Sequence, residues 1–95
     1  MIVDLEQAKA QCDLIGDDND ARLMLALEQS VAVVLDFIKV DADEYEDEYG
    51  DSDYPTLVAA AILLCTQALF QNPEQDPLTD AVKSILHRFR DPALA

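Results

Sequence analysis

The sequence has few residues that favour strands or tight turns, which argues against a fold built from β-sheets. Its 95 residues include only two glycines and no tryptophan. Alanine, leucine, glutamate, glutamine and aspartate outweigh the β-branched residues, which favours helices. A chain of this length forms one small core. We therefore expect a single all-α domain spanning residues 1–95.

Basic residues are also scarce. Six lysines and arginines stand against twenty acidic residues, so the formal net charge is −14. Binding to a nucleic-acid backbone needs a basic footprint, which excludes an electrostatic grip on DNA. The acidic excess leaves open a solvated surface, a metal site, a mimic of nucleic acid, or a lining to which a polyanion does not stick.

No apolar run is long enough to cross a membrane. The most apolar window is YPTLVAAAILLCTQALF at 54–70, which falls short of the roughly 18 residues needed and contains Thr66 and Gln67. The first residues lack a basic segment followed by an apolar one, so we expect no secretory signal. These features predict a protein of the reducing cytoplasm with no membrane partner.

The sequence lacks the residue patterns that are typical of catalytic sites. No nucleophile, base and orienting acid occur at a recognisable spacing, and there is no glycine-rich phosphate loop. His87 is the only histidine, and we expect it to be exposed or to cap a helix end. Cys12 and Cys65 have no C-x-x-C pattern, so both are predicted to be small buried hydrophobes. We expect no enzyme activity and no cofactor.

Helical periodicity predicts a bundle of about four helices with two long core helices. The central one spans 54–70, with Pro55 at its first position and Ser52 or Asp53 as its cap. It carries two apolar rows, which are Leu57, Ala61, Leu64 and Ala68, and Val58, Ile62, Cys65 and Leu69. Two rows imply packing partners on both sides, so this helix is expected to be buried.

Three further helices complete the predicted bundle. A short N-terminal helix runs from the cap Asp4, with Gln7 as its capping-box partner, to about Cys12, and Gly16 closes this segment. The second long helix is expected from Ala21 to about Lys39. Its apolar stripe comprises Leu23, Leu27, Val31, Val34 and Ile38, widened by Met24 and Leu35. The last helix begins at Asp76-Pro77, ends at Arg90 and leaves a tail at 91–95.

The segment 41–53, DADEYEDEYGDSD, has eight acids in thirteen positions and no base. Mutual repulsion and the lack of an apolar face predict an extended or mobile loop. Tyr45 and Tyr49 could anchor it to the body or to a neighbour, or extend the preceding helix slightly. A calcium-binding EF-hand does not fit, because Tyr45 takes a ligand position and Glu46 takes the glycine position. We predict no specific metal site.

Ser52 follows Gly50-Asp51, which invites comparison with acyl carrier proteins, whose modified serine stands in an Asp-Ser-Leu motif at a helix start. Here Asp53-Tyr54-Pro55 follows the serine, so the leucine is absent. Ser52 is more simply a capping residue.

Several stretches resemble the tailed-phage head–tail connector proteins. They are LEQAK at 5–9, the acidic cap DDND at 17–20, the apolar run from Pro55 that leads to QNPE at 71–74, and ILHRFRDPALA at 85–95. The resemblance covers nearly the whole chain, and the ending LHRFRDPALA is its most specific part. The tyrosine-rich acidic loop is more acidic than the family pattern leads one to expect.

The resemblance implies a structural adaptor of the virion neck, assembled in the cytoplasm of the host bacterium. Such a subunit forms a homo-oligomeric ring, dodecameric in the particle, below the portal protein. The ring extends the DNA channel and gives the stopper or tail-completion protein a docking surface. DNA passes through it without specific binding.

Two sets of residues are candidates for these contacts. We expect Arg88 and Arg90 to meet carboxylates of a neighbouring subunit or of the portal, and Pro92 and Leu94 to pack into a partner's groove. The alternative is that both arginines are solvated cations at a helix end. The second set is predicted to face the channel, where like charge lets DNA slide: Asp43, Glu44, Glu46, Asp47 and Glu48.

One other function class fits the charge. An acidic helical protein can mimic DNA and occupy the groove of a basic DNA-binding partner. A mimic works as a monomer or dimer, whereas a connector needs its last helix and tail for contacts in the ring.

Overall fold

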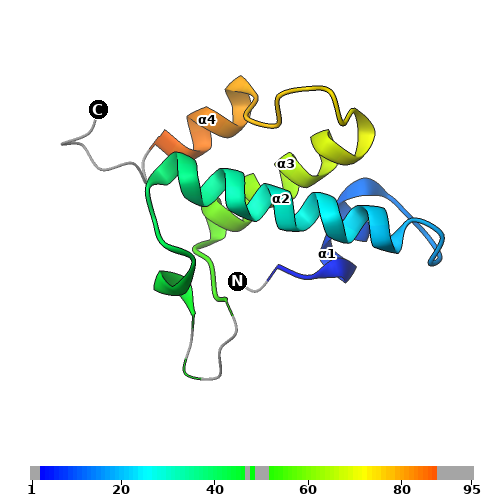
Figure 1. Ribbon diagram of the computed structural model, residues 1–95, viewed down its shortest axis with the longest axis horizontal. Coiled ribbons are helices and arrows are strands. Elements are labelled where there is room, and N and C mark those ends of the chain that lie inside the picture. The colour runs from blue at the N-terminus through cyan, green and yellow to red at the C-terminus, as the bar shows by residue number, and fades with distance from the viewer. Residues whose placement is uncertain (1–2, 47, 49–51, 88–95) are drawn as a thin grey trace.

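The computed structural model describes residues 3–46, 48 and 52–87. Within these residues the chain forms four α-helices and one 3-10 helix: α1 (Leu5–Cys12), α2 (Asp20–Ile38), η1 (Ala42–Tyr45), α3 (Thr56–Gln71) and α4 (Asp80–Leu86). Figure 1 shows α2 running across the molecule in front of α3, with α4 on one side and α1 on the other. The predicted all-α bundle of about four helices is confirmed.

Helix α3 is the centre of the bundle and contacts α1, α2 and α4. Its buried side chains cover much of its circumference: Val58, Ala59, Ala61, Ile62, Leu63, Cys65 and Thr66. The predicted apolar rows were wrong at Leu57, which is 39% exposed. This residue lies in the first turn of α3, where the described helices leave it partly uncovered. Leu64, Ala68 and Leu69 are only partly buried.

Helix α2 buries one stripe along α3, as its periodicity predicts. Leu23, Leu27, Val34, Leu35 and Ile38 are buried, and Val31 is half-buried. Met24 was predicted to widen this stripe but is 36% exposed. The helix ends where Lys39 takes a left-handed conformation with φ 61°.

Helix α1 has the predicted capping box. Asp4 Oδ1 accepts a hydrogen bond from the Gln7 backbone N–H at 3.0 Å, and Gln7 Oε1 accepts one from the Asp4 N–H at 3.2 Å. These bonds satisfy two donors that a helix start otherwise leaves free. The helix closes at Asp13, which is left-handed with φ 57°, three residues before Gly16.

Two side-chain contacts hold α1 against the body. Lys9 Nζ lies 2.9 Å from Asp20 Oδ1 at the start of α2, and this bond raises the pKa of Lys9. Gln11 donates a hydrogen bond to Gln67 Oε1 of α3 at 2.9 Å. The first link spans 11 positions and the second spans 56, so each joins α1 to a different helix of the tertiary fold.

Two predicted helix starts were wrong. Pro55 is the N-cap of α3 and not its first residue. Helix α4 begins at Asp80, where Thr79 Oγ1 accepts from the Val82 N–H. Asp76 instead accepts from the Leu78 N–H in a turn, which postpones the helix. Its predicted end at Arg90 lies outside the described residues.

None of the described helices is long and apolar enough to span a bilayer.

Candidate functional site

The predicted interface residues Arg88, Arg90, Pro92 and Leu94 lie outside the described residues, as does Asp47 of the acidic set. His87 is described and sits exposed at the C-cap of α4, as predicted. The structure therefore bears on the remaining acidic residues and on the surface that could receive a partner.

The acidic segment has more structure than the predicted extended loop. It begins with η1, and its two arms meet through an isolated antiparallel bridge between Glu46 and Ser52. The Asp53 N–H donates to the Tyr45 carbonyl at 2.7 Å, which reinforces this pairing. In Figure 1 the described arms extend from the end of the bundle where α2 stops and α3 starts.

An aromatic pair anchors the segment to the core. The rings of Tyr45 and Tyr54 pack edge-to-face with their centroids 5.8 Å apart. Tyr54 is buried, and Tyr45 packs against the main core cluster, so the predicted anchoring role of Tyr45 is confirmed. Burial and the nearby Glu44 carboxylate raise the pKa of the Tyr45 hydroxyl. Tyr49 lies outside the described residues.

The described acids of this segment lie on the outside of that anchor. Asp43, Glu44, Glu46 and Glu48 are all exposed. Together these solvated carboxylates form a negatively charged end of the molecule. Such a surface repels polyanions and attracts cationic side chains.

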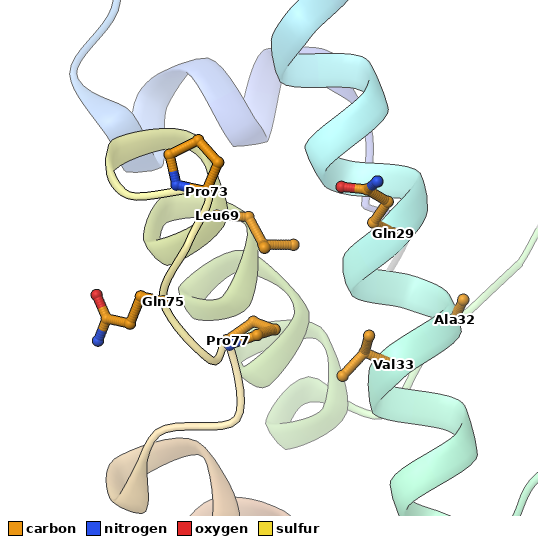
Figure 2. A pocket seen from close by; sticks show the side chains of 7 residues that line it. All are labelled: Gln29, Ala32, Val33, Leu69, Pro73, Gln75 and Pro77. Carbon is orange, nitrogen blue, oxygen red and sulfur yellow. The ribbon is translucent and has the colours of Figure 1, made fainter.

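A second surface was not predicted from the sequence. An open groove of about 440 Å³ lies between α2 and the connection from α3 to α4, lined by Gln29, Ala32, Val33, Leu69, Pro73, Gln75 and Pro77. Figure 2 shows Leu69 and Pro77 directed toward α2, with Val33 facing Pro77 across the gap, whereas Gln75 points away. Most of these side chains are apolar and have no charge. We call this surface the α2–connection groove.

The groove continues toward the start of α2 into a smaller hollow. Arg22, Leu25, Ala26 and Phe70 line this extension together with Gln29, Leu69 and Pro73. The Arg22 guanidinium lies 4.1 Å from the centre of the Phe70 ring and donates to the Phe70 carbonyl. Leu25 beside it is 54% exposed, so this end offers more apolar surface to a partner.

Cys65 fixes the wall of the groove that the connection forms. Its thiol donates to the Pro77 carbonyl at 3.3 Å, which ties the connection to α3. Burial, with a contribution from the Asp76 carboxylate, raises the pKa of Cys65 to about 11, so the thiol stays protonated. Cys65 is fully buried as predicted, but Cys12 is only half-buried.

Exposed acidic residues flank both ends of the groove. Asp36 follows Val33 by one helical turn and is exposed, so it shares that face of α2. Glu74 and Asp76 are exposed on either side of Gln75 in the connection. Arg22 stands at the end opposite Asp36. The groove is thus apolar along its length, with exposed carboxylates near both ends and Arg22 at the end nearer the start of α2.

Sequence reasoning missed this groove because its two walls are joined only in three dimensions. A signal was present at 73–77, where two prolines enclose a short connection. Ala32 and Val33 also lie off the buried stripe of α2. Neither observation shows that these segments lie opposite one another.

No cluster of three or more histidine, cysteine, aspartate or glutamate side chains able to hold a metal ion occurs in the described part of the chain. Comparisons of the chain with protein-family models, curated proteins and solved structures give no match.

Proposed function

We propose that this chain is a subunit of a tailed-phage head–tail connector, which assembles as a ring below the portal. The observation that carries the proposal is the resemblance of nearly the whole chain, most specific at LHRFRDPALA in 86–95. The four-helix fold is compatible with the small helical adaptor that this resemblance implies. In this proposal the protein has a structural role and binds its partners through its surface.

A closed ring needs two different complementary surfaces on every subunit, because each copy contacts its neighbours head to tail. This chain has candidates for both. Its acidic residues and the α2–connection groove provide an acidic and apolar surface. The segment 88–95 supplies Arg88 and Arg90 followed by Pro92 and Leu94. These residues would meet a neighbouring copy or the portal.

The exposed acids at the anchored end fit the second part of the proposal. Asp43, Glu44, Glu46 and Glu48 would face the DNA channel, where their charge keeps DNA from adhering. The Tyr45–Tyr54 contact would hold them in place while DNA moves past.

The test is the molar mass by light scattering, measured first on the purified protein and then after mixing with the portal protein encoded by the same genome. We expect capture by the portal, and loss of capture when residues 88–95 are deleted. The deletion leaves the buried Val82 and Leu86 of α4 in place, and circular dichroism checks that the helices remain.

A strict monomer that ignores the portal would contradict the connector proposal. That result would favour the acidic mimic of DNA, and the next measurement would be binding to a basic DNA-binding protein. Capture that survives the deletion would keep the connector but move its interface away from residues 88–95.

A further inference from the structure

Helix α1 contributes little to the hydrophobic core. Its inward face is formed by Leu5, Ala8 and Cys12, and of these only Ala8 is fully buried. Val3 and Leu14 on either side of the helix are partly buried. Two of the three inward side chains are small, so their burial contributes less free energy than that of larger apolar residues. Helices α2 and α3 instead bury leucine, isoleucine and valine side chains where they pack together.

The ion pair between Lys9 of α1 and Asp20 of α2 is partly shielded from water. Lys9 Nζ lies 2.9 Å from Asp20 Oδ1, and the Lys9 side chain is 15% exposed. Asp20 Oδ1 is itself buried and, apart from this contact, has no hydrogen-bond partner among the described residues. A buried carboxylate oxygen without a cation or a donor is costly. Loss of the Lys9 charge therefore favours any state in which Asp20 regains contact with water.

Lys9 also separates two groups of like charge. The pKa of Lys9 is raised, first of all by its bond to Asp20, so the side chain is charged at neutral pH. Asp17 Oδ1 lies 3.8 Å from the same ammonium. Without this cation, the carboxylates of α1 and those at the start of α2 would repel each other. Lys9 is the only base among residues 1–21, which contain six acids: Asp4, Glu6, Asp13, Asp17, Asp18 and Asp20.

The connection between α1 and α2 has the features of a hinge. Ile15, Gly16, Asp17 and Asp18 are all exposed, and Ile15 is 98% exposed. Gly16 has a φ of 88°, in the left-handed region that favours glycine. In Figure 1 this loop lies at the edge of the molecule. Few packing contacts therefore oppose a rotation of α1 about it.

We propose that α1 is a strap that opens as a unit about residues 13–19 while α2, α3 and α4 stay folded, and that the positive charge of Lys9 holds it closed. In the closed state Lys9 neutralises Asp20, and Gln11 donates a hydrogen bond to Gln67 of α3. Opening exposes the inward face of α1 and the edge of α2 and α3 beneath it. This device belongs to the single subunit. It goes beyond the proposed function and needs neither a ring nor a portal.

Backbone hydrogen exchange, followed by NMR on the full chain, tests the opening. The Ala8 N–H donates to the Asp4 carbonyl in α1, and the amides of residues 62–66 lie inside α3. Relative to intrinsic rates, amides 8–12 should exchange at least about tenfold faster than amides 62–66, because α1 opens without global unfolding. Equal protection of the two sets would mean that α1 opens only with the whole protein, which overturns the proposal.

Lys9→Met removes the charge and keeps most of the apolar stem. It should accelerate exchange of amides 8–12 by about tenfold or more and leave amides 62–66 unchanged. Lys83→Met is the matched control, since Lys83 is exposed on α4, on the other side of the molecule from α1. It should change neither set. The proposal is overturned if Lys9→Met leaves α1 protected, if it accelerates both sets equally, or if Lys83→Met opens α1 as much.

Two further variants separate the charge of Lys9 from its packing. Lys9→Arg keeps the charge and should open α1 less than Lys9→Met. Asp20→Asn should open α1 in the original chain but add no further opening to Lys9→Met, because the carboxylate has already lost its cation there. Equal opening by Lys9→Arg and Lys9→Met, or additive effects of Lys9→Met and Asp20→Asn, would show that this ion pair does not hold the strap closed.

Discussion

At the scale of single residues, two buried hydroxyl groups behave differently. Thr66 Oγ1 donates to the Ile62 carbonyl one turn earlier in α3 at 2.8 Å. Ser30 of α2 is equally buried, but its Oγ has no hydrogen-bond partner among the residues that the structure describes. A buried hydroxyl without a partner loses its bonds to water on folding and gains none in return. Ser30 is thus a local weak point of the core.

Ser30→Ala should therefore stabilise the protein. The substitution removes the unsatisfied hydroxyl and places a better helix former in α2, so the free energy of unfolding should rise by about 1 kcal/mol. Urea unfolding followed by circular dichroism measures this change. Thr66→Val is the comparison, because it removes a satisfied hydroxyl and should not stabilise. A loss of stability in Ser30→Ala would mean that the hydroxyl has a partner.

At the scale of elements, the connection from α3 to α4 is held by a few specific bonds. The Cys65 thiol donates to Pro77, Asp76 accepts from the Leu78 N–H, and the Gln75 N–H donates to the Asn72 carbonyl. These bonds fix the wall of the groove. They also explain why α4 begins late, since the turn at Asp76 delays the helix.

Cys65 should react with thiol reagents far more slowly than an exposed cysteine. With its pKa raised from 9.0 to about 11, its thiolate fraction at pH 8 falls by roughly 100-fold, and burial hinders access further. Labelling by a disulfide reagent in a Cys12→Ala variant measures this rate. Fast labelling in the absence of denaturant would show that the connection opens readily.

The same thiol makes stability depend on alkaline pH. Because the folded state holds the Cys65 proton more tightly than the unfolded state, this contribution is complete below about pH 9 and is lost as pH rises toward 11. Urea midpoints over that range should fall more steeply in the original protein than in Cys65→Ala. Parallel curves would contradict the raised pKa, since Lys9 and Tyr45 titrate in both proteins.

At the scale of the whole molecule, the exposed acids of 41–53 and the apolar groove are separated in space. The described acids of 41–53 are exposed at one end of the bundle, while the apolar groove lies along α2. A ring built from such subunits can present carboxylates to its channel and use other surfaces for its contacts. This arrangement connects the fold to the proposed passage of DNA.

If the connector proposal holds, replacing Asp43, Glu44, Glu46 and Glu48 by their amides should slow or trap DNA passage through assembled particles, because the proposed channel loses charge that repels DNA. Ejection kinetics of particles carrying the variant measure the effect. The control replaces four exposed acids outside the segment: Glu6, Asp13, Asp18 and Glu28. Unchanged kinetics in assembled variant particles would remove these residues from the channel.

The sequence by itself determined the features that depend on neighbouring residues. Periodicity predicted the order of the four helices and the central place of α3, and the Asp4–Gln7 pair predicted the start of α1. The sequence also predicted the burial of Cys65, and anchoring to the body was one of the roles that it left open for Tyr45. These predictions succeed because helical spacing and capping act over one or two turns.

Only the tertiary structure decided which apolar residues are covered and where the groove lies. Leu57 and Met24 satisfy the helical pattern, yet the elements that the structure describes do not cover them fully. The groove joins Val33 of α2 to Pro77, which are 44 positions apart in the chain. Burial and concavity depend on which distant segments meet, and periodicity within one helix carries no information about that meeting.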